Sequence, residues 1–144
     1  MRVVLDTNVI VTAMRRPGGA SGALLLEAAA GRVEALATAA LCFEYEAVCR
    51  RPEHLAAAGF TPADADVFLD AVIDLVTPVE VAFRWRPQLN DPGDEMVLEA
   101  AVNGRASSIV SFNLRHYRPA TRFGLRIETP SDALTRLLQE RGSR

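Results

Sequence analysis

Several oxygen-bearing side chains of this sequence stand directly after short apolar runs or at a tight turn. They are Asp6, Asn8, Asp91, Asp94, Ser111 and Asn113. Carboxylates that crowd together repel one another and stay ionised only if a cation neutralises them. Hard oxygen ligands favour Mg²⁺ or Mn²⁺. If the fold brings these residues together, the pattern predicts a metal site that can assist phosphoryl transfer.

The elements that must position these residues alternate between strands and helices. Apolar, β-branched runs predict a strand over 2–6, buried on both faces, and a second buried strand over 107–112. Shorter strands are expected over 33–38, 77–83 and 125–129. Helices are expected from Ser21 to Gly31, from 39 to 51, from Thr61 onward, from Asp94 to Gly104 and over 131–141. This alternation indicates one α/β domain over residues 1–144 with a largely parallel sheet.

In such sheets ligands bind beyond the carboxyl ends of the strands. Asp6 stands at the end of the first predicted strand, and Asn113 follows the strand over 107–112. Asp94 opens the helix that leads into that strand. If the two strands are neighbours, their polar ends converge, and Glu44 on the second predicted helix is a further candidate for the same cluster.

Each of these residues also has a purely structural interpretation. Asp6 fits a cap or turn after a strand, and Asp94 fits a helix cap. Asp91 in "DPGD" fits a turn residue, and Glu44 only borders the apolar side of its helix. The pattern alone leaves both interpretations open.

Charge is distributed unevenly along the chain. All 16 basic residues are Arg, and the formal net charge is −2. Residues 105–127 contain five Arg and His116 but no acid. Such a segment is either a solvated surface or a phosphate-binding face, since Arg forks match phosphate geometry.

Neither a membrane nor an oxidising compartment is indicated. The longest apolar runs fall short of the ~18 residues of a membrane span. Cys42 and Cys49 lie seven residues apart without a metal-binding pattern, and they fit reduced thiols of a cytoplasmic protein.

Four stretches together resemble the PIN domain, in particular its bacterial group of toxin components of toxin–antitoxin systems. They are "VVLDTNVIV" (3–11), "TAALCFEYEAVCRRP" (38–52), "DPGDEMVLEAAVNGRASSIVSFN" (91–113) and "IETPSDAL" (127–134). The resemblance implies a three-layer α/β/α domain that cleaves RNA with Mg²⁺ or Mn²⁺. It further implies a cognate antitoxin protein and a homodimer.

By position, the resemblance implies that Asp6, Glu44 and Asp94 are the family's first three acids. Glu46 is an alternative for the second, and Asp91 is a further candidate metal ligand. Asn8 and Ser111 match the small polar residues that orient the acids. Asn113 stands where many PIN domains have a fourth Asp, so the site has one negative charge fewer. Asn113 is expected to act as a neutral ligand or to orient water.

Basic residues on both sides of these acids would form the rim of the pocket and hold the backbone of RNA. The candidates are Arg15, Arg16, Arg115, His116 and Arg118.

Two other functions compete with a ribonuclease. A phosphoaspartate enzyme also places Asp after its first strand, but it requires a Lys that this sequence lacks. A PIN-like domain that has lost turnover through Asn113 would instead bind RNA or a partner protein.

Overall fold

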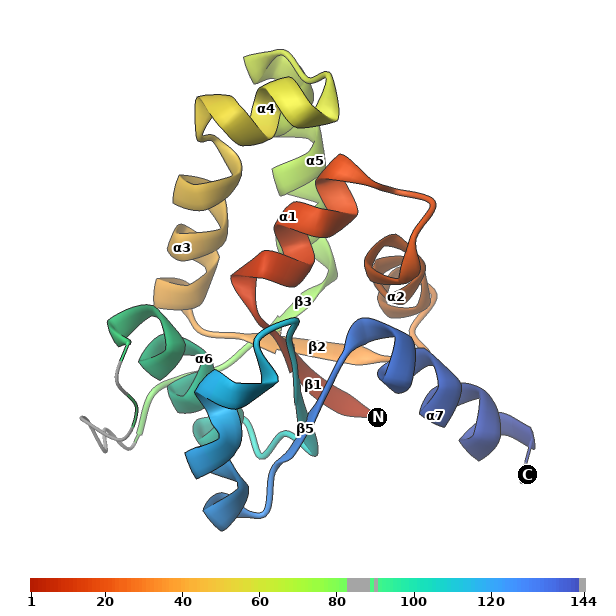
Figure 1. Cartoon of the computed structure of the whole chain (residues 1–144), viewed down its shortest axis with the longest axis vertical. Coiled ribbons are helices and arrows are strands. Elements are labelled where there is room, and N and C mark those ends of the chain that lie inside the picture. The colour runs from red at the N-terminus through yellow and green to blue at the C-terminus, as the bar shows by residue number, and fades with distance from the viewer. Residues whose placement is uncertain (83–88, 90, 143–144) are drawn as a thin grey trace.

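The computed structural model describes residues 1–82, 89 and 91–142 (Figure 1). Its strands are β1 (Arg2–Leu5), β2 (Glu34–Ala37), β3 (Val76–Pro78), β4 (Ser108–Val110) and β5 (Arg126–Glu128). Its α-helices are α1 (Thr7–Arg15), α2 (Ala20–Ala29), α3 (Ala39–Cys49), α4 (Pro52–Ala58), α5 (Pro62–Leu75), α6 (Pro92–Asn103) and α7 (Pro130–Gly142). A 3₁₀ helix, η1 (Leu114–Phe123), joins β4 to β5.

The five strands form one parallel sheet in the order β3-β2-β1-β4-β5. Helices cover both of its faces, with α1 to α5 on one side and α6 and η1 on the other (Figure 1). The predicted three-layer α/β/α fold is therefore confirmed. The strand order reverses at β1 and β4, which pair through Val4 and Ile109. This reversal is the point where open α/β sheets hold their ligands.

The central strands are buried because helices cover the sheet on both sides. Val3, Val4, Ile109 and Val110 have no exposed surface. Their apolar side chains fix the register of β1 against β4, and that register sets where the polar residues after each strand lie.

Several predicted boundaries were wrong. The strand predicted over 107–112 ends at Val110, so Ser111 and Phe112 follow it. The strand predicted over 2–6 ends at Leu5, because Asp6 caps α1 and the apolar residues that follow belong to that helix. Gly19, not Ser21, is the N-cap of α2, and Ser21 is buried within the helix. Asp91, not Asp94, caps α6: its Oδ1 accepts hydrogen bonds from the N–H groups of Gly93 (2.7 Å) and Asp94 (3.4 Å).

The helix α7 is anchored to β5 by a buried ion pair. Arg136 donates to both carboxylate oxygens of Glu128, at 2.6 and 3.2 Å. Side chains of this pair are 14% and 6% exposed. Because the helix also packs against α2, this end of the chain is tied to both neighbouring elements.

Parts of the sequence analysis fall on residues outside the described set. They are residue 83 at the end of the predicted strand over 77–83, most of the loop that Pro and Gly predict over 84–94, and Phe83 and Trp85, apolar residues beside that loop that are candidates for an interface or a core edge. The described residues 79–82 of that predicted strand are not strand, since β3 ends at Pro78. Within residues 1–82, 89 and 91–142, none of the helices is long and apolar enough to cross a membrane.

Candidate active site

Asp6 is held at the carboxyl end of β1 by the first residue of α1 and by the chain at the end of β4. Its backbone N–H donates to the carbonyl of Val110 on β4 at 2.9 Å. Its Oδ1 accepts from the N–H of Thr7 at 2.8 Å, and its Oδ2 accepts from the hydroxyl of Ser111 at 2.6 Å. The side chain is thus fixed from β1, α1 and β4 at once.

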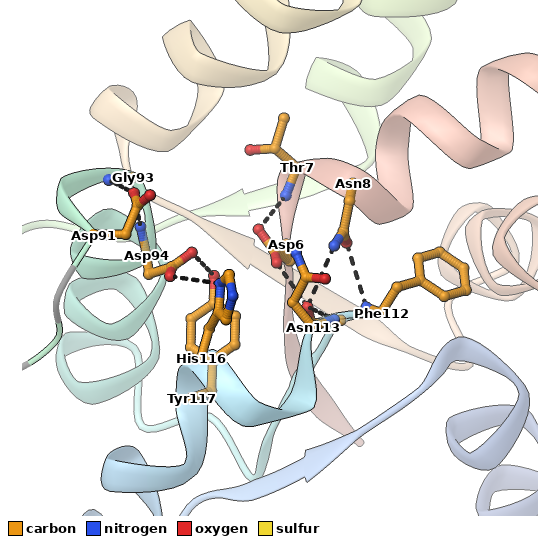
Figure 2. A network of polar contacts seen from close by, with 11 residues as sticks. Asp6, Thr7, Asn8, Asp91, Gly93, Asp94, Phe112, Asn113, His116 and Tyr117 are labelled. Carbon is orange, nitrogen blue, oxygen red and sulfur yellow. Dashed lines mark hydrogen bonds and ion pairs between the residues drawn. The ribbon is translucent and has the colours of Figure 1, made fainter.

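Ser111 links Asp6 to the chain after β4. Its hydroxyl donates to Asp6 and accepts from the backbone N–H of Asn113 at 2.9 Å. Asn8 approaches the same hydroxyl with its Nδ2 at 3.5 Å (Figure 2). Ser111 has no exposed surface, so the hydroxyl orients Asp6 without competition from water.

Asp94 lies in the first turn of α6 and is oriented by two residues of η1. Its Oδ1 accepts from the phenol of Tyr117 at 3.0 Å, and its Oδ2 lies 3.2 Å from Nδ1 of His116. Figure 2 shows the carboxylate directed toward this pair. Asp94 therefore faces η1, with its side chain 14% exposed.

Asp6 and Asp94 share one electrostatic environment. Burial is the main cause that raises the pKa of Asp6, and the negative charge of Asp94 raises it further. Burial also raises the pKa of Asp94, and the charge of Asp91 adds to the effect. Hydrogen bonds from Ser111 to Asp6 and from Tyr117 to Asp94 oppose these shifts. Two partly desolvated carboxylates in mutual repulsion are a site where a cation would be stabilised.

Tyr117 is a site residue that the sequence did not reveal. It is fully buried, and its phenol hydrogen-bonds Asp94 and stabilises the ionised form of Asp6 as well. Burial is the largest of several causes that raise the pKa of this phenol. Tyr117 thus joins the two acids from β1 and α6 while remaining a neutral hydrogen-bond donor.

The two other predicted acids, Glu44 and Asp91, have different surroundings. Glu44 is half-buried on α3, beside Tyr45, whose phenol donates to the carbonyl of Leu5 at the end of β1. Asp91 is exposed and uses its side chain to cap α6. Across the described part of the chain, no three His, Cys, Asp or Glu side chains form a group that could hold a metal ion by themselves.

Exposed basic residues stand on two sides of the acids. Arg115 and Arg118 lie on η1 next to His116, and Arg15 and Arg16 lie at the end of α1. In the part of the chain that the structure describes, Arg15 and Arg16 line a pocket of about 320 Å³ together with Thr12 and Phe112.

The family profile of the PIN domain matches residues 2–115, which is most of the chain and includes β1, α6 and β4. The chain belongs to the PIN-domain family. PIN domains are commonly nucleases that use divalent metal ions, so membership indicates a nuclease in general terms. Searches among curated proteins and among solved structures gave no significant match.

The donor set of this PIN domain fits such an ion. Asp6 and Asp94 offer carboxylate oxygens, and neither has an Arg partner among the described residues. Hard oxygen donors in mutual repulsion suit Mg²⁺ or Mn²⁺.

Proposed function

We propose that this PIN domain is a metal-dependent ribonuclease that hydrolyses phosphodiester bonds of RNA. The observation that carries the proposal is the coupled pair of Asp6 and Asp94 at the point where the strand order reverses. Asp94 raises the pKa of Asp6 across that point. Two partly buried like charges that have no Arg partner among the described residues cost stability, and such costs are typical of functional sites.

Each residue of the site has a role in this proposal. Asp6 and Asp94 would hold Mg²⁺ or Mn²⁺, with Glu44 and Asp91 as further candidate ligands. The ion would supply a Lewis acid and lower the pKa of a bound water. Ser111 and Asn8 orient Asp6, whereas Tyr117 and His116 orient Asp94. Asn113 would contribute a neutral amide oxygen.

The substrate that we propose follows from the exposed basic residues beside the acids, and the partners follow from the resemblance to toxins. Exposed Arg15, Arg16, Arg115 and Arg118, with His116, would contact RNA phosphates. The protein would act in the cytoplasm as the toxin of a type II toxin–antitoxin pair, as a homodimer that a cognate antitoxin inhibits. Residues 1–144 would form a single domain in that assembly.

A second candidate is a PIN domain with weak or no turnover that binds RNA or a partner protein. Two observations favour it. Asn113 replaces a family acid, and no group of three metal-binding side chains occurs among the described residues.

Cleavage of a labelled single-stranded RNA with Mn²⁺, Mg²⁺ or a chelator tests the proposal. We expect the wild-type protein to cut the RNA only with metal, and we expect Asp94→Asn to lower the rate at least about a hundredfold. Asp70→Asn, an exposed change on α5, is the matched control and should cut normally. If the wild-type protein binds RNA but cuts none with either metal, the second candidate is correct.

A further inference from the structure

A pocket on the Asn8 side of Asp6 combines one aromatic ring with two cations. Phe112, Thr12, Arg15 and Arg16 line it, and its volume is about 320 Å³. Neither guanidinium has a hydrogen-bond or ion-pair partner among the residues that the structure describes, and both side chains are exposed. The lining includes no acid, so the pocket suits an anion with an apolar or aromatic part.

The ring of Phe112 is tied by its backbone to the acidic site. Phe112 lies between Ser111, which donates to Asp6, and Asn113. Its N–H approaches Oδ1 of Asn8 at 3.5 Å. The ring is 47% exposed and points away from Asp6 and Asp94 (Figure 2). A group bound on this ring would therefore lie on the Asn8 side of Asp6, away from Asp94, without entering the site of the acids.

The other wall of the pocket is equally fixed with respect to Asn8. The hydroxyl of Thr12 donates to the carbonyl of Asn8 at 2.7 Å, one turn earlier in α1. Arg15 and Arg16 follow at the end of the same helix, and the N–H of Arg16 donates to the carbonyl of Thr12 at 2.8 Å. Phe112 follows Ser111, which contacts Asp6, and Thr12 is bonded to Asn8, which contacts Ser111. The position of the pocket relative to Asp6 is therefore fixed by the fold.

This combination matches the way proteins hold single strands of nucleic acid. Bases stack on exposed aromatic rings regardless of sequence, while Arg contacts the backbone phosphates. A base inside a duplex has both faces covered by its neighbours, and therefore cannot stack on a side chain.

We propose that this pocket binds one unpaired base of the RNA on the ring of Phe112, with Arg15 and Arg16 on the adjoining phosphate. The inference rests on the proposed ribonuclease function. It deepens that function by assigning a nucleotide subsite next to the cleaved bond and by requiring an unstacked base there.

Binding of short RNA to the metal-free full-length chain tests the subsite apart from turnover. Tetranucleotides that carry one abasic position in turn are titrated by fluorescence anisotropy against the wild-type protein, Phe112→Ala and Phe112→Trp. For the wild-type protein and Phe112→Trp, we expect one abasic position to weaken binding about 5- to 150-fold, as loss of one base–aromatic stack does. For Phe112→Ala that abasic position should have almost no further effect, because the ring is already absent.

Two controls separate this subsite from other causes. Phe43→Ala removes a ring that is 69% exposed on α3 and lines no part of the pocket; it should retain the wild-type abasic profile. The double variant Arg15→Gln/Arg16→Gln should reduce the dependence of log affinity on log salt by about 0.7, the value for one phosphate of a single strand, and should leave the abasic profile unchanged.

Equal abasic profiles for the wild-type protein and Phe112→Ala would overturn the inference. So would a Phe112→Ala variant that changes only self-association in sedimentation, since the ring would then belong to a protein interface. Failure of the ribonuclease proposal looks different: the wild-type protein would show the expected binding profile and yet cut no RNA with metal.

Discussion

At the scale of single residues, the site depends on the hydrogen-bond partners that orient the carboxylates of Asp6 and Asp94. The positions of Asp6 and Asn113 were predictable, because polar residues that close buried apolar runs lie at the ends of strands. Ser111 lies within the strand predicted over 107–112 but follows β4 in the structure. The position of Tyr117 was not predictable, because it stands among charged residues and no apolar residues recur around it at α-helical spacing. A signal exists at spacing three: Tyr117 and Ala120 are the buried residues of η1, as expected for a helix with three residues per turn.

Replacing Asp6 by Asn should change how the stability of the metal-free protein depends on pH. The folded protein raises the pKa of Asp6, so it binds this proton more tightly than the unfolded chain does. Without metal, the free energy of unfolding should therefore fall as pH rises from the ordinary carboxyl value of about 3.9 through the raised value. Asp6→Asn removes this group and can still cap α1, and urea titrations between about pH 4 and 7 should show a smaller decrease.

The comparison is made in chelator, with Asp70→Asn as the exposed control. At neutral pH we expect Asp6→Asn to be at least as stable as the wild-type protein. A variant that is less stable at neutral pH but equal at low pH would mean that ionised Asp6 stabilises the fold, which contradicts the account.

Tyr117→Phe should impair the site while it preserves the core. The change removes the phenol that donates to Asp94 but retains the buried ring. Partners that orient metal ligands are worth about 10- to 100-fold in metal affinity or activity, so the Mn²⁺ concentration for half-maximal cleavage should rise by that factor. Tyr45→Phe removes the phenol that contacts Leu5 and should lower only stability, by about 1 kcal/mol. Equal metal dependence of the wild-type protein and Tyr117→Phe would refute this role.

At the scale of elements, sequence patterns found most strands and helices but misplaced several ends. The parallel α/β order and the helix after Thr61 follow from alternation and capping; Thr61 and Asp64 form the predicted start as a capping box. The helix α1 was missed, because its apolar residues continue those of β1 and only the cap at Asp6 divides them. The helix α4 was also missed, because Pro52, which directly follows the helix predicted over 39–51, fits the first turn of a new helix as well as the end of the old one.

Gly22 of α2 lies close to the backbone of Pro17 in the loop between α1 and α2, a contact that the sequence alone does not reveal. A Cβ at Gly22 would lie 2.1 Å from the carbonyl oxygen of Pro17, so α2 can pack there only without a side chain. We expect Gly22→Ala to lower the free energy of unfolding by about 1–3 kcal/mol, as measured by urea denaturation. Gly18→Ala, which meets nothing within 4 Å, is the matched control, and equal effects of the two would show that the close contact does not matter.

At the scale of the whole molecule, the acids of the site are shielded from solvent, whereas the Arg residues on either side of them are exposed. The chain carries a formal net charge of −2, yet the coupled acids are shielded while the Arg residues of α1 and η1 are exposed. Sequence indicated this basic rim from the acid-free segment over 105–127. It could not indicate how α3 lies against the end of β1, because that contact depends on the buried phenol of Tyr45, which donates to the carbonyl of Leu5. The central claim is therefore the joint action of Asp6 and Asp94 on a metal ion.

Calorimetric titration of Mn²⁺ into the wild-type protein, Asp6→Asn, Asp94→Asn and Asp70→Asn at neutral pH tests that claim most directly. We predict that the wild-type protein and Asp70→Asn bind Mn²⁺ alike, and that Asp6→Asn and Asp94→Asn each weaken binding at least about tenfold, because each removes a carboxylate ligand. Equal Mn²⁺ binding by the wild-type protein and both site variants would contradict the claim that these two acids form the metal site.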